Sequence, residues 1–297
     1  MNTKKESNMK YFAPSELIIN EDGSVFHLHV RPEQIAHKII LVGDPGRVEI
    51  VASHFESREH EIQSREFCTV TGLYKGKRIS VVSTGIGCDN IDIVVNELDA
   101  LVNIDFATRT EKAELTSLEL VRIGTCGGLQ PFTPVGTFIC SDKSIGFDGL
   151  LNYYAGRDRV CDLAFEEAFK RHMDWNPQKG APYVIDNNPE LTSRVGGDAM
   201  VHGVTIACGG FFGPQGRELR IPLADPHQNE KIMAFEYEGR RITNFEMEGS
   251  ALAGLSALLG HRAMTCCMVI ANRVAHEANT AYKSSIDDLI RIVLDRI

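Results

Sequence analysis

The sequence lacks the features that would mark a membrane, secreted or nucleic-acid-binding protein. Its 297 residues contain no run of 18 apolar residues, so no membrane-spanning helix is predicted. The polar N-terminal stretch 1–16 has no apolar core of the kind that a secretory signal needs. Positive charge is scarce, because 31 Lys and Arg residues stand against 40 Asp and Glu residues, a net charge of −9. This balance argues against nucleic acid as a partner, although local arginines can still hold a small anion.

Paired cysteines are also absent. None of the eight cysteines belongs to a C-x-x-C pair or to a metal-finger spacing. Several lie in apolar runs, such as TFIC (137–140) and MTCCMVIA (264–271), which is typical of reduced, buried thiols in a cytoplasmic protein. Cys126 stands beside glycines and is a conceivable nucleophile, but the sequence positions no base next to it. We therefore expect a cytoplasmic protein without a bound metal.

Apolar residues make up 43% of the chain, and apolar runs of strand character alternate with amphipathic stretches. The chain is long enough to bury a substantial core. Strands are expected at 37–43, 118–124, 135–142, 201–210 and 262–273, a hairpin over 66–85, and helices over 44–55, 90–102, 159–172, 246–260 and 284–297. This order predicts a single three-layer α/β domain over 26–297, preceded by a polar arm over 1–25. The charged stretch 107–117 is expected to be a surface insertion.

The residues that follow the predicted strands indicate a site for an anion. Ligands of such sheets gather at the carboxyl ends of the strands. Glycine lets backbone N–H groups approach an oxyanion, and arginine binds phosphate oxygens with two parallel hydrogen bonds. The residues of these types at strand ends are Gly43, Arg47, Thr84, Gly85, Gly87, Arg122, Gly124 and Thr125. For each glycine alone, an ordinary tight turn is the alternative. The stretch GIG (85–87) lacks the third glycine of a dinucleotide-binding motif, and no G-K-[ST] of a P-loop occurs.

The segment NFEMEGS (244–250) places two acids on either side of Met247, where a strand passes into a helix. On a strand, Glu246 and Glu248 would face the same way. One interpretation is a carboxylate pair that accepts hydrogen bonds from sugar hydroxyls, with the thioether against the apolar face of the sugar. The other is one helix-capping acid and one solvated acid. The residues alone leave both open.

The loop GGFFGPQGREL (209–219) joins a flat apolar surface to polar groups. Phe211 and Phe212 precede Gln215, an amide that both donates and accepts, and Arg217, which only donates. Such a set suits a flat ligand with a polar edge. The alternative is a surface turn with incidental polar residues.

Taken together, these stretches resemble the nucleoside phosphorylases of the uridine phosphorylase type. The resemblance runs from about residue 24 to the C-terminus, apart from 107–117 and the region around 174–196. The matching motifs are FHL (26–28), GDPGR (43–47), REF (65–67), STGIG (83–87), RIGTCGG (122–128), FFGPQGR (211–217), NFEMEGS (244–250) and VIANR (269–273). The resemblance implies a single-domain, three-layer α/β/α fold with a central mixed β-sheet.

The resemblance also implies a role for each matching residue. Phosphate would be bound by Gly43, Arg47, Arg122 and Thr125, and by Arg65 of a neighbouring subunit. His27 of that neighbour would reach the 5′-hydroxyl of the nucleoside. The substrate-binding residues would further include Phe211 on the pyrimidine ring, Gln215 and Arg217 on its edge, Thr125, and Glu246, Met247 and Glu248 on the ribose. Arg217, Gln215, Arg47 and Arg122 would carry catalysis.

The implied reaction is phosphorolysis of uridine by inorganic phosphate to uracil and ribose 1-phosphate, with no cofactor. Purine enzymes of this superfamily use an acid after the late strand, where this chain has Asn272 and Arg273, so a pyrimidine is favoured. The alternatives are a phosphorylase of deoxyuridine, thymidine or purine nucleosides, a hydrolytic nucleosidase, and a non-catalytic nucleoside-binding protein. We expect a homohexamer, with a dimer as the alternative. A monovalent cation between subunits is in doubt, because residues 88–90 depart from the family pattern.

Overall fold

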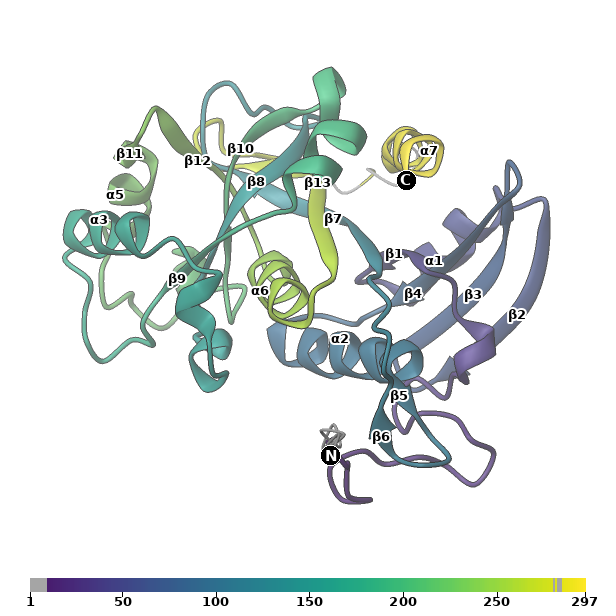
Figure 1. Ribbon diagram of the computed structural model, residues 1–297. Coiled ribbons are helices and arrows are strands. Elements are labelled where there is room, and N and C mark those ends of the chain that lie inside the picture. Colours follow the sequence, from purple (N-terminus) through teal and green to yellow (C-terminus); the bar gives the residue numbers. More distant parts are fainter. Residues whose placement is uncertain (1–9, 280, 282–284) are drawn as a thin grey trace.

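One large sheet organises the molecule. The computed structural model describes residues 10–279, 281 and 285–297, and it contains a 12-stranded sheet (Figure 1). Its main path runs β11 (Glu236–Tyr237), β12 (Arg240–Glu246), β10 (Val201–Ala207), β8 (Phe138–Gly146), β13 (Arg262–Asn272), β7 (Glu119–Gly128), β1 (Lys38–Val42), β4 (Lys77–Ser83), β3 (Phe67–Tyr74) and β2 (Ser57–Ser64). Two further strands join this path, since β9 (Tyr183–Asp186) pairs with β8 and β14 (Glu277–Ala278) pairs with β13.

The sheet is mixed and partly closed on itself. Strand β1 is parallel to both β4 and β7, whereas β13 and β8 are antiparallel. Antiparallel pairs of Asn244 with Gly128 and of Phe245 with Gly127 also join β12 to β7. The strands β7, β13, β8, β10 and β12 therefore form a ring. The expected central mixed sheet is confirmed, and the closure brings the end of β12 against the end of β7.

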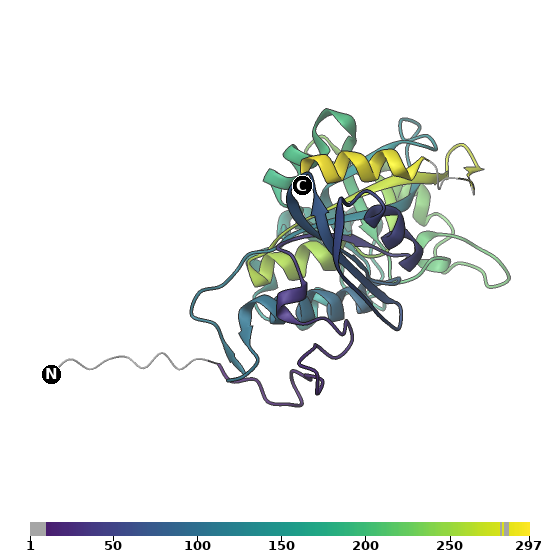
Figure 2. The same cartoon turned by 90° about the vertical axis from the view of Figure 1, so that its right-hand side faces the viewer.

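Helices cover both faces of the sheet. On one face, α2 (Cys88–Asn103) and α6 (Gly249–Leu259) pack with Ile39 and Leu41 of β1. On the other, α1 (Pro45–Ala52) and α7 (Ile286–Arg296) pack with Ile40 and Val42 of the same strand. Successive side chains of a strand point to opposite faces, so β1 serves both cores. Figures 1 and 2 show the resulting layers, and the predicted three-layer α/β/α fold is confirmed. A third core contains α3 (Leu163–Met173) and α5 (Gln228–Ala234).

Local sequence signals placed several element ends correctly. The Asp44 side chain caps α1 by accepting a hydrogen bond of 2.9 Å from the N–H of Gly46, with Pro45 at the first helical position. Helix α6 ends at Gly260, whose φ of 81° is favourable for glycine. The predicted start of this helix was wrong, because Glu246 is still the last residue of β12.

The predicted insertion 107–117 is exposed, and it pairs with the N-terminal arm. Strand β6 (Thr110–Glu111) pairs with β5 (Ile104–Asp105), and Tyr11 forms a bridge to Thr110. The guanidinium of Arg109 donates to the carbonyl oxygens of Phe12, at 2.9 Å, and of Ala13, at 3.3 Å. The arm and the insertion therefore form one surface unit; the first nine residues of the predicted arm lie outside the described residues.

All eight cysteines are unpaired, six of them buried and Cys68 and Cys161 partly so. This agrees with the apolar runs in which they occur. None of the helices in the described part of the chain combines the length and the apolar character that crossing a bilayer requires.

Candidate active site

The predicted phosphate residues meet where β1 ends beside the middle of β7. Arg47, on the first turn of α1, is 6% exposed, and its Nη1 donates to the carbonyl oxygen of Ile123 at 3.3 Å. Ile123 is the register partner of Val42, the last residue of β1. Arg122 and Thr125 lie on β7 on either side of this contact. The parallel pairing of two strands thus joins residues more than 70 positions apart.

A glycine turn borders the same place. A Cβ atom added to Gly43 would lie 3.3 Å from the carbonyl oxygen of Gly85, so the two backbones approach closely. Gly85 and Gly87 both have positive φ, of 71° and 102°, and Gly87 directly precedes α2. The N–H of Gly87 donates to Oε1 of Glu248 at 2.8 Å. The predicted glycines therefore provide both the turn and a close backbone approach.

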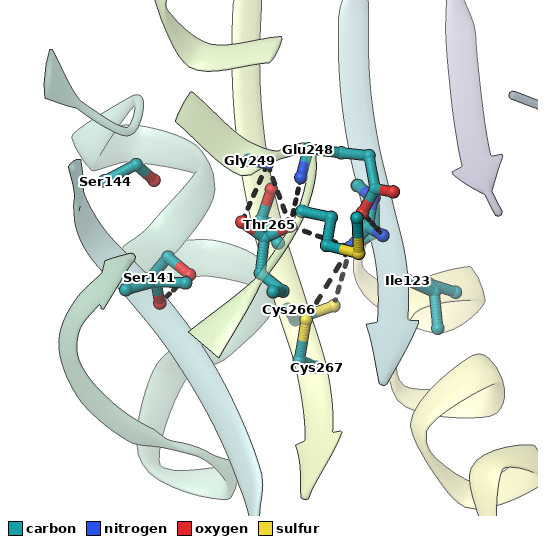
Figure 3. A network of polar contacts seen from close by, with 12 residues as sticks. Ile123, Ser141, Ser144, Glu248, Gly249, Thr265, Cys266 and Cys267 are labelled. Carbon is teal, nitrogen blue, oxygen red and sulfur yellow. Dashed lines mark hydrogen bonds and ion pairs between the residues drawn. The ribbon is translucent and has the colours of Figure 1, made fainter. Parts of the chain in front are cut away.

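Arg122 lies at the centre of a buried ionic cluster. Its side chain is 5% exposed, and Nη1 is 3.2 Å from Oε2 of Glu246. Nη2 forms an ion pair with Oε2 of Glu248, and Nη1 is 3.7 Å from Sγ of Cys267. Figure 3 shows this neighbourhood, with Glu248 and Gly249 near Cys267 of β13. Arg122, which was predicted to bind phosphate, thus also contacts the predicted ribose wall.

Burial and charge shift the pKa values in this cluster in opposite ways. Burial acts to lower the pKa of Arg122, but the carboxylates of Glu248 and Glu246 outweigh it and raise that pKa, so the guanidinium stays charged. Burial raises the pKa of Glu246 to about 7, and the carboxylate of Glu248 adds to this rise while Arg122 opposes it. Two carboxylates thus share one guanidinium.

Glu246 also determines where α6 begins. Its carboxylate accepts hydrogen bonds from the N–H groups of Glu248, at 2.9 Å, and Gly249, at 2.8 Å. Of the two interpretations of these acids, capping therefore holds for Glu246, but Glu248 is buried and paired with Arg122 instead of solvated. Both acids turn toward one guanidinium, although only Glu246 lies on a strand. Met247 between them is partly exposed, and its carbonyl oxygen accepts from Sγ of Cys88 at 3.1 Å.

The predicted base-binding loop follows β10, next to this cluster. Ala207, the last residue of β10, pairs in register with Glu246. Beyond it, Nη1 of Arg217 donates to Oε1 of Gln215 at 2.5 Å and to the carbonyl oxygen of Phe211 at 2.5 Å. The guanidinium carbon of Arg217 lies 3.7 Å from the centre of the Phe211 ring, which is 50% exposed. The loop therefore presents an aromatic face beside an amide and a guanidinium.

A second arginine supports the loop. Nη2 of Arg273, just beyond β13, lies 3.5 Å from the carbonyl oxygen of Gln215, and its backbone N–H donates to Gly128 of β7 at 3.0 Å. Burial lowers the pKa of Arg217 to about 10, and the nearby charge of Arg273 contributes. From the sequence, Arg273 indicates only that an acid is missing at this position. Its contact with the loop depends on the β7–β13 pairing, which no local pattern indicates.

His27 and Arg65 make their contacts at a different place. Nδ1 of His27 lies 2.6 Å from Oε1 of Glu97 on α2, and its backbone N–H donates to the same carboxylate. Arg65, exposed and with a φ of 54°, lies over the ring of Phe26, with 5.6 Å between its guanidinium carbon and the ring centre. The rings of Phe26 and His27 are 4.9 Å apart. The two residues predicted to act on a neighbouring subunit thus flank one phenylalanine.

Cys126 is buried, and its environment argues against the nucleophile considered above. Burial raises the pKa of its thiol well above the usual value, and the sulfur of Cys267 contributes. A thiol of this kind stays protonated at neutral pH.

The comparisons with known proteins agree with this geometry. The model of the Phosphorylase superfamily matches residues 37–295. A uridine phosphorylase of Thermococcus kodakarensis is 29% identical over 282 residues, which cover 91% of this chain and 85% of the relative. A uridine phosphorylase of Haemophilus influenzae is 29% identical over 255 residues, which cover 85% of this chain and 88% of the relative.

Solved structures of similar proteins have the same fold. A nucleoside phosphorylase of Trypanosoma brucei, described as showing uridine phosphorylase activity, superposes with a TM-score of 0.86 at 28% identity and covers 94% of this chain and 98% of its own. A structure from a study of two uridine phosphorylases of Phytophthora capsici superposes with a TM-score of 0.68 at 21% identity, over 97% of this chain and 98% of its own. The second likeness concerns the fold alone.

Proposed function

Because this chain belongs to the phosphorylase superfamily, we propose that it cleaves uridine with inorganic phosphate to give uracil and ribose 1-phosphate, a pentosyl transfer. The two relatives named above are uridine phosphorylases, and they match most of the chain. The observation that carries the choice of base is the contact between Arg217 and Gln215 beside the Phe211 ring.

The two side chains match the edge of uracil atom by atom. Because Nη1 of Arg217 donates to Oε1 of Gln215, the amide of Gln215 has a defined orientation, with its NH₂ group directed away from the guanidinium. The NH₂ group then donates to O2, Oε1 accepts from N3–H with its second lone pair, and Arg217 donates to O4. The order donor, acceptor, donor complements the order O2, N3–H, O4. The half-exposed Phe211 ring supplies the stacking surface.

The remaining groups are assigned to ribose and phosphate. Glu246, Met247 and Glu248 line the ribose, where Glu248 accepts hydrogen bonds from the hydroxyls. Phosphate is held by Arg47, Thr125, Arg122 and the backbone at Gly43. A phosphate oxygen forms a bond to C1′ while the bond from C1′ to N1 breaks, and the electron pair passes into the uracil ring. Arg217 and Gln215 stabilise the charge that develops on O4 and O2, which lowers the barrier.

We assign the site to an assembly of at least two chains. Arg65 and His27 are directed to a shared surface around Phe26, where they are available to the site of a neighbour. Arg65 would add a third cation to the phosphate, and His27, oriented by Glu97, would bind the 5′-hydroxyl. A homohexamer is our preferred assembly, and a dimer would suffice for this exchange. We further propose that the enzyme is cytoplasmic and needs no cofactor or metal for the reaction.

The test is uracil release from uridine, with and without phosphate, beside inosine and thymidine. Release that depends on phosphate and is far faster from uridine than from inosine supports the proposal. Release without phosphate would make the protein a hydrolytic nucleosidase. Faster release from thymidine or inosine would assign another phosphorylase substrate. Tight binding without release would indicate a nucleoside-binding protein.

A further inference from the structure

Three potential metal ligands lie together on strands β8 and β10. They are Sγ of Cys140, a carboxylate oxygen of Asp142 and a ring nitrogen of His202, all within 4.8 Å of one another. Cys140 and His202 are register partners on parallel neighbouring strands, and Asp142 lies two residues further along β8. The register of β8 and β10 shifts at Asp142, which has no partner on β10, and at this irregularity the carboxylate of Asp142 lies beside the imidazole of His202. Among the residues that the structure describes, this is the one such group of three.

The hydrogen bonds of His202 leave one of its nitrogens facing an acid. Nε2 lies 3.0 Å from the carbonyl oxygen of Gly197, which can only accept, so this nitrogen carries a hydrogen. Nδ1 of the neutral ring then has a lone pair, and it lies 2.7 Å from Oδ1 of Asp142. A proton shared by Nδ1 and Oδ1 accounts for this distance, and a metal ion bound by both atoms would replace that proton. A ligating histidine commonly donates its other N–H to a backbone carbonyl, as His202 does here.

Cys140 and its surroundings favour the metal. The side chain of Cys140 is fully buried, and its sulfur has only a weak contact of 3.9 Å with the carbonyl oxygen of Thr192. The π-helical turn Thr192–Gly196 passes over it, and a Cβ atom at Gly196 would lie 2.7 Å from Sγ of Cys140 and 3.3 Å from Cε1 of His202. The backbone of Gly196 therefore packs closely against the sulfur and the imidazole, and a larger residue at this position would clash with the sulfur.

From these observations we propose that Cys140, Asp142 and His202 bind a zinc ion. A thiolate, an imidazole and a carboxylate are all ligand types that Zn²⁺, an ion of intermediate softness, binds in proteins. Tetrahedral ligands of zinc lie about 3.3–3.7 Å apart, so atoms at the 4.8 Å limit would have to approach by roughly 1 Å, whereas Nδ1 of His202 and Oδ1 of Asp142, 2.7 Å apart, would have to separate by a similar amount. The thiolate and the carboxylate neutralise the ion, and the thiol proton is released to solvent. Water completes the fourth position, since the side chains of Asp142 and His202 are 28% and 34% exposed.

The competing cation is Arg240, whose Nη1 is 3.7 Å from Oδ2 of Asp142. This distance is at the weak end for an ion pair, and it engages the oxygen that does not face His202. The zinc ion would join the π-helical turn, β8 and β10, and so stabilise the fold. It lies far from the base-binding loop, because His202 precedes the end of β10 at Ala207 by five residues, about 16 Å of strand. We therefore expect it to leave phosphorolysis unchanged.

The test uses the full-length, reduced protein after treatment with a chelator. Titration with Co²⁺, a spectroscopic substitute for Zn²⁺, should give the charge-transfer absorption of a cobalt–thiolate bond at one equivalent per chain. Zn²⁺ should displace the cobalt and raise the melting temperature. In Cys140→Ser the absorption band should disappear. In His202→Ala the affinity for Zn²⁺ should fall more than 100-fold, because loss of a residue that only supports a metal ligand already costs about 10- to 100-fold.

The matched controls are Cys68→Ser and His172→Ala, a thiol and an imidazole elsewhere in the chain, and both should bind like the wild type. His202→Ala changes a partly exposed side chain, so it keeps the test valid if Cys140→Ser folds poorly. The proposal is overturned if the wild type binds no Co²⁺ or Zn²⁺ at about micromolar concentration. It is also overturned if His202→Ala binds as tightly as the wild type, because the ion then lies elsewhere.

Discussion

Replacing Arg217 by alanine tests the base-recognition part of the site most directly. The guanidinium has two functions in our proposal. It donates to the uracil O4 in the transition state, and through its 2.5 Å hydrogen bond to Oε1 it orients the amide of Gln215. The alanine variant loses both. The side chain is only about half-buried and packs on a phenylalanine that is itself 50% exposed, so the fold should tolerate the change.

The expected loss in kcat follows from both functions. Removal of one donor that stabilises a developing negative charge costs roughly 10²- to 10³-fold, or about 2.7–4 kcal/mol of transition-state stabilisation. The loss should be at the upper end of this range, because the amide of Gln215 is then free to flip. The pKa of the Arg217 guanidinium, about 10, keeps this side chain protonated across the neutral range. The ratio of the rates of wild type and variant should therefore not change between pH 6 and pH 8.

The assay is steady-state uridine phosphorolysis at saturating phosphate, with the free energy of unfolding measured in parallel. Arg220→Ala is the matched control, because Arg220 is an exposed arginine of the same loop with no role in the proposed site. A kcat of Arg217→Ala within a few-fold of the wild type would refute the assignment of the loop. An equal loss in Arg220→Ala would also refute it, since a general effect of positive charge would then explain the data.

Three further predictions concern the buried cluster and the subunit contacts. Burial raises the pKa of Glu246 from 4.5 in the unfolded chain to about 7, so its protonated form stabilises the fold fully below pH 4.5, and this contribution is lost as the pH rises through 7. Glu246→Gln should therefore flatten the fall in unfolding free energy between pH 5 and 8 in urea titrations; an unchanged slope would contradict the assignment. Glu248→Ala should cost about 3–5 kcal/mol of stability by chemical denaturation, because Arg122 loses a buried partner, and Glu248→Gln should cost less. Mixing inactive Arg65→Ala with inactive Arg217→Ala should restore about a quarter of the wild-type sites if chains exchange randomly as dimers; no recovery after verified exchange would place Arg65 outside the neighbouring site.

Part of this site could be predicted from the sequence, because its residues follow strands whose ends are recognisable. The run ending at Val42 and the Asp44 cap fix where α1 begins, so Gly43 and Arg47 were placed correctly. Parallel pairing of β1 with β7 then brings Arg122 to the same place without further information. The base came from the family resemblance, and the donor and acceptor order of Gln215 and Arg217, which is a property of the residues themselves, is compatible with it.

Other features depend on contacts that no local pattern contains. The closure of the sheet by β12 and β7 rests on two residue pairs over 100 positions apart, and it determines that Glu246 faces Arg122. Strand β2 alternates charged and partly buried residues, and its sequence is mostly polar, so periodicity did not reveal it. The sequence also did not predict the group formed by Cys140, Asp142 and His202, because Cys140 and His202 become neighbours only through the register of β8 and β10.

The buried cluster connects the two halves of the proposed substrate site electrostatically. Arg122 carries one positive charge, whereas Glu246, Glu248 and a phosphate dianion would together carry four negative ones if all were ionised. Arg47 and a neighbour's Arg65 supply two more cations, which still leaves an excess of negative charge. A protonated Glu246 reduces this excess by one unit, and its pKa of about 7 makes that proton available near neutral pH. Bound phosphate would raise this pKa further, so Glu246 should take up its proton as the phosphate binds. The acid that caps α6 would then be the group that adjusts its charge when the site fills.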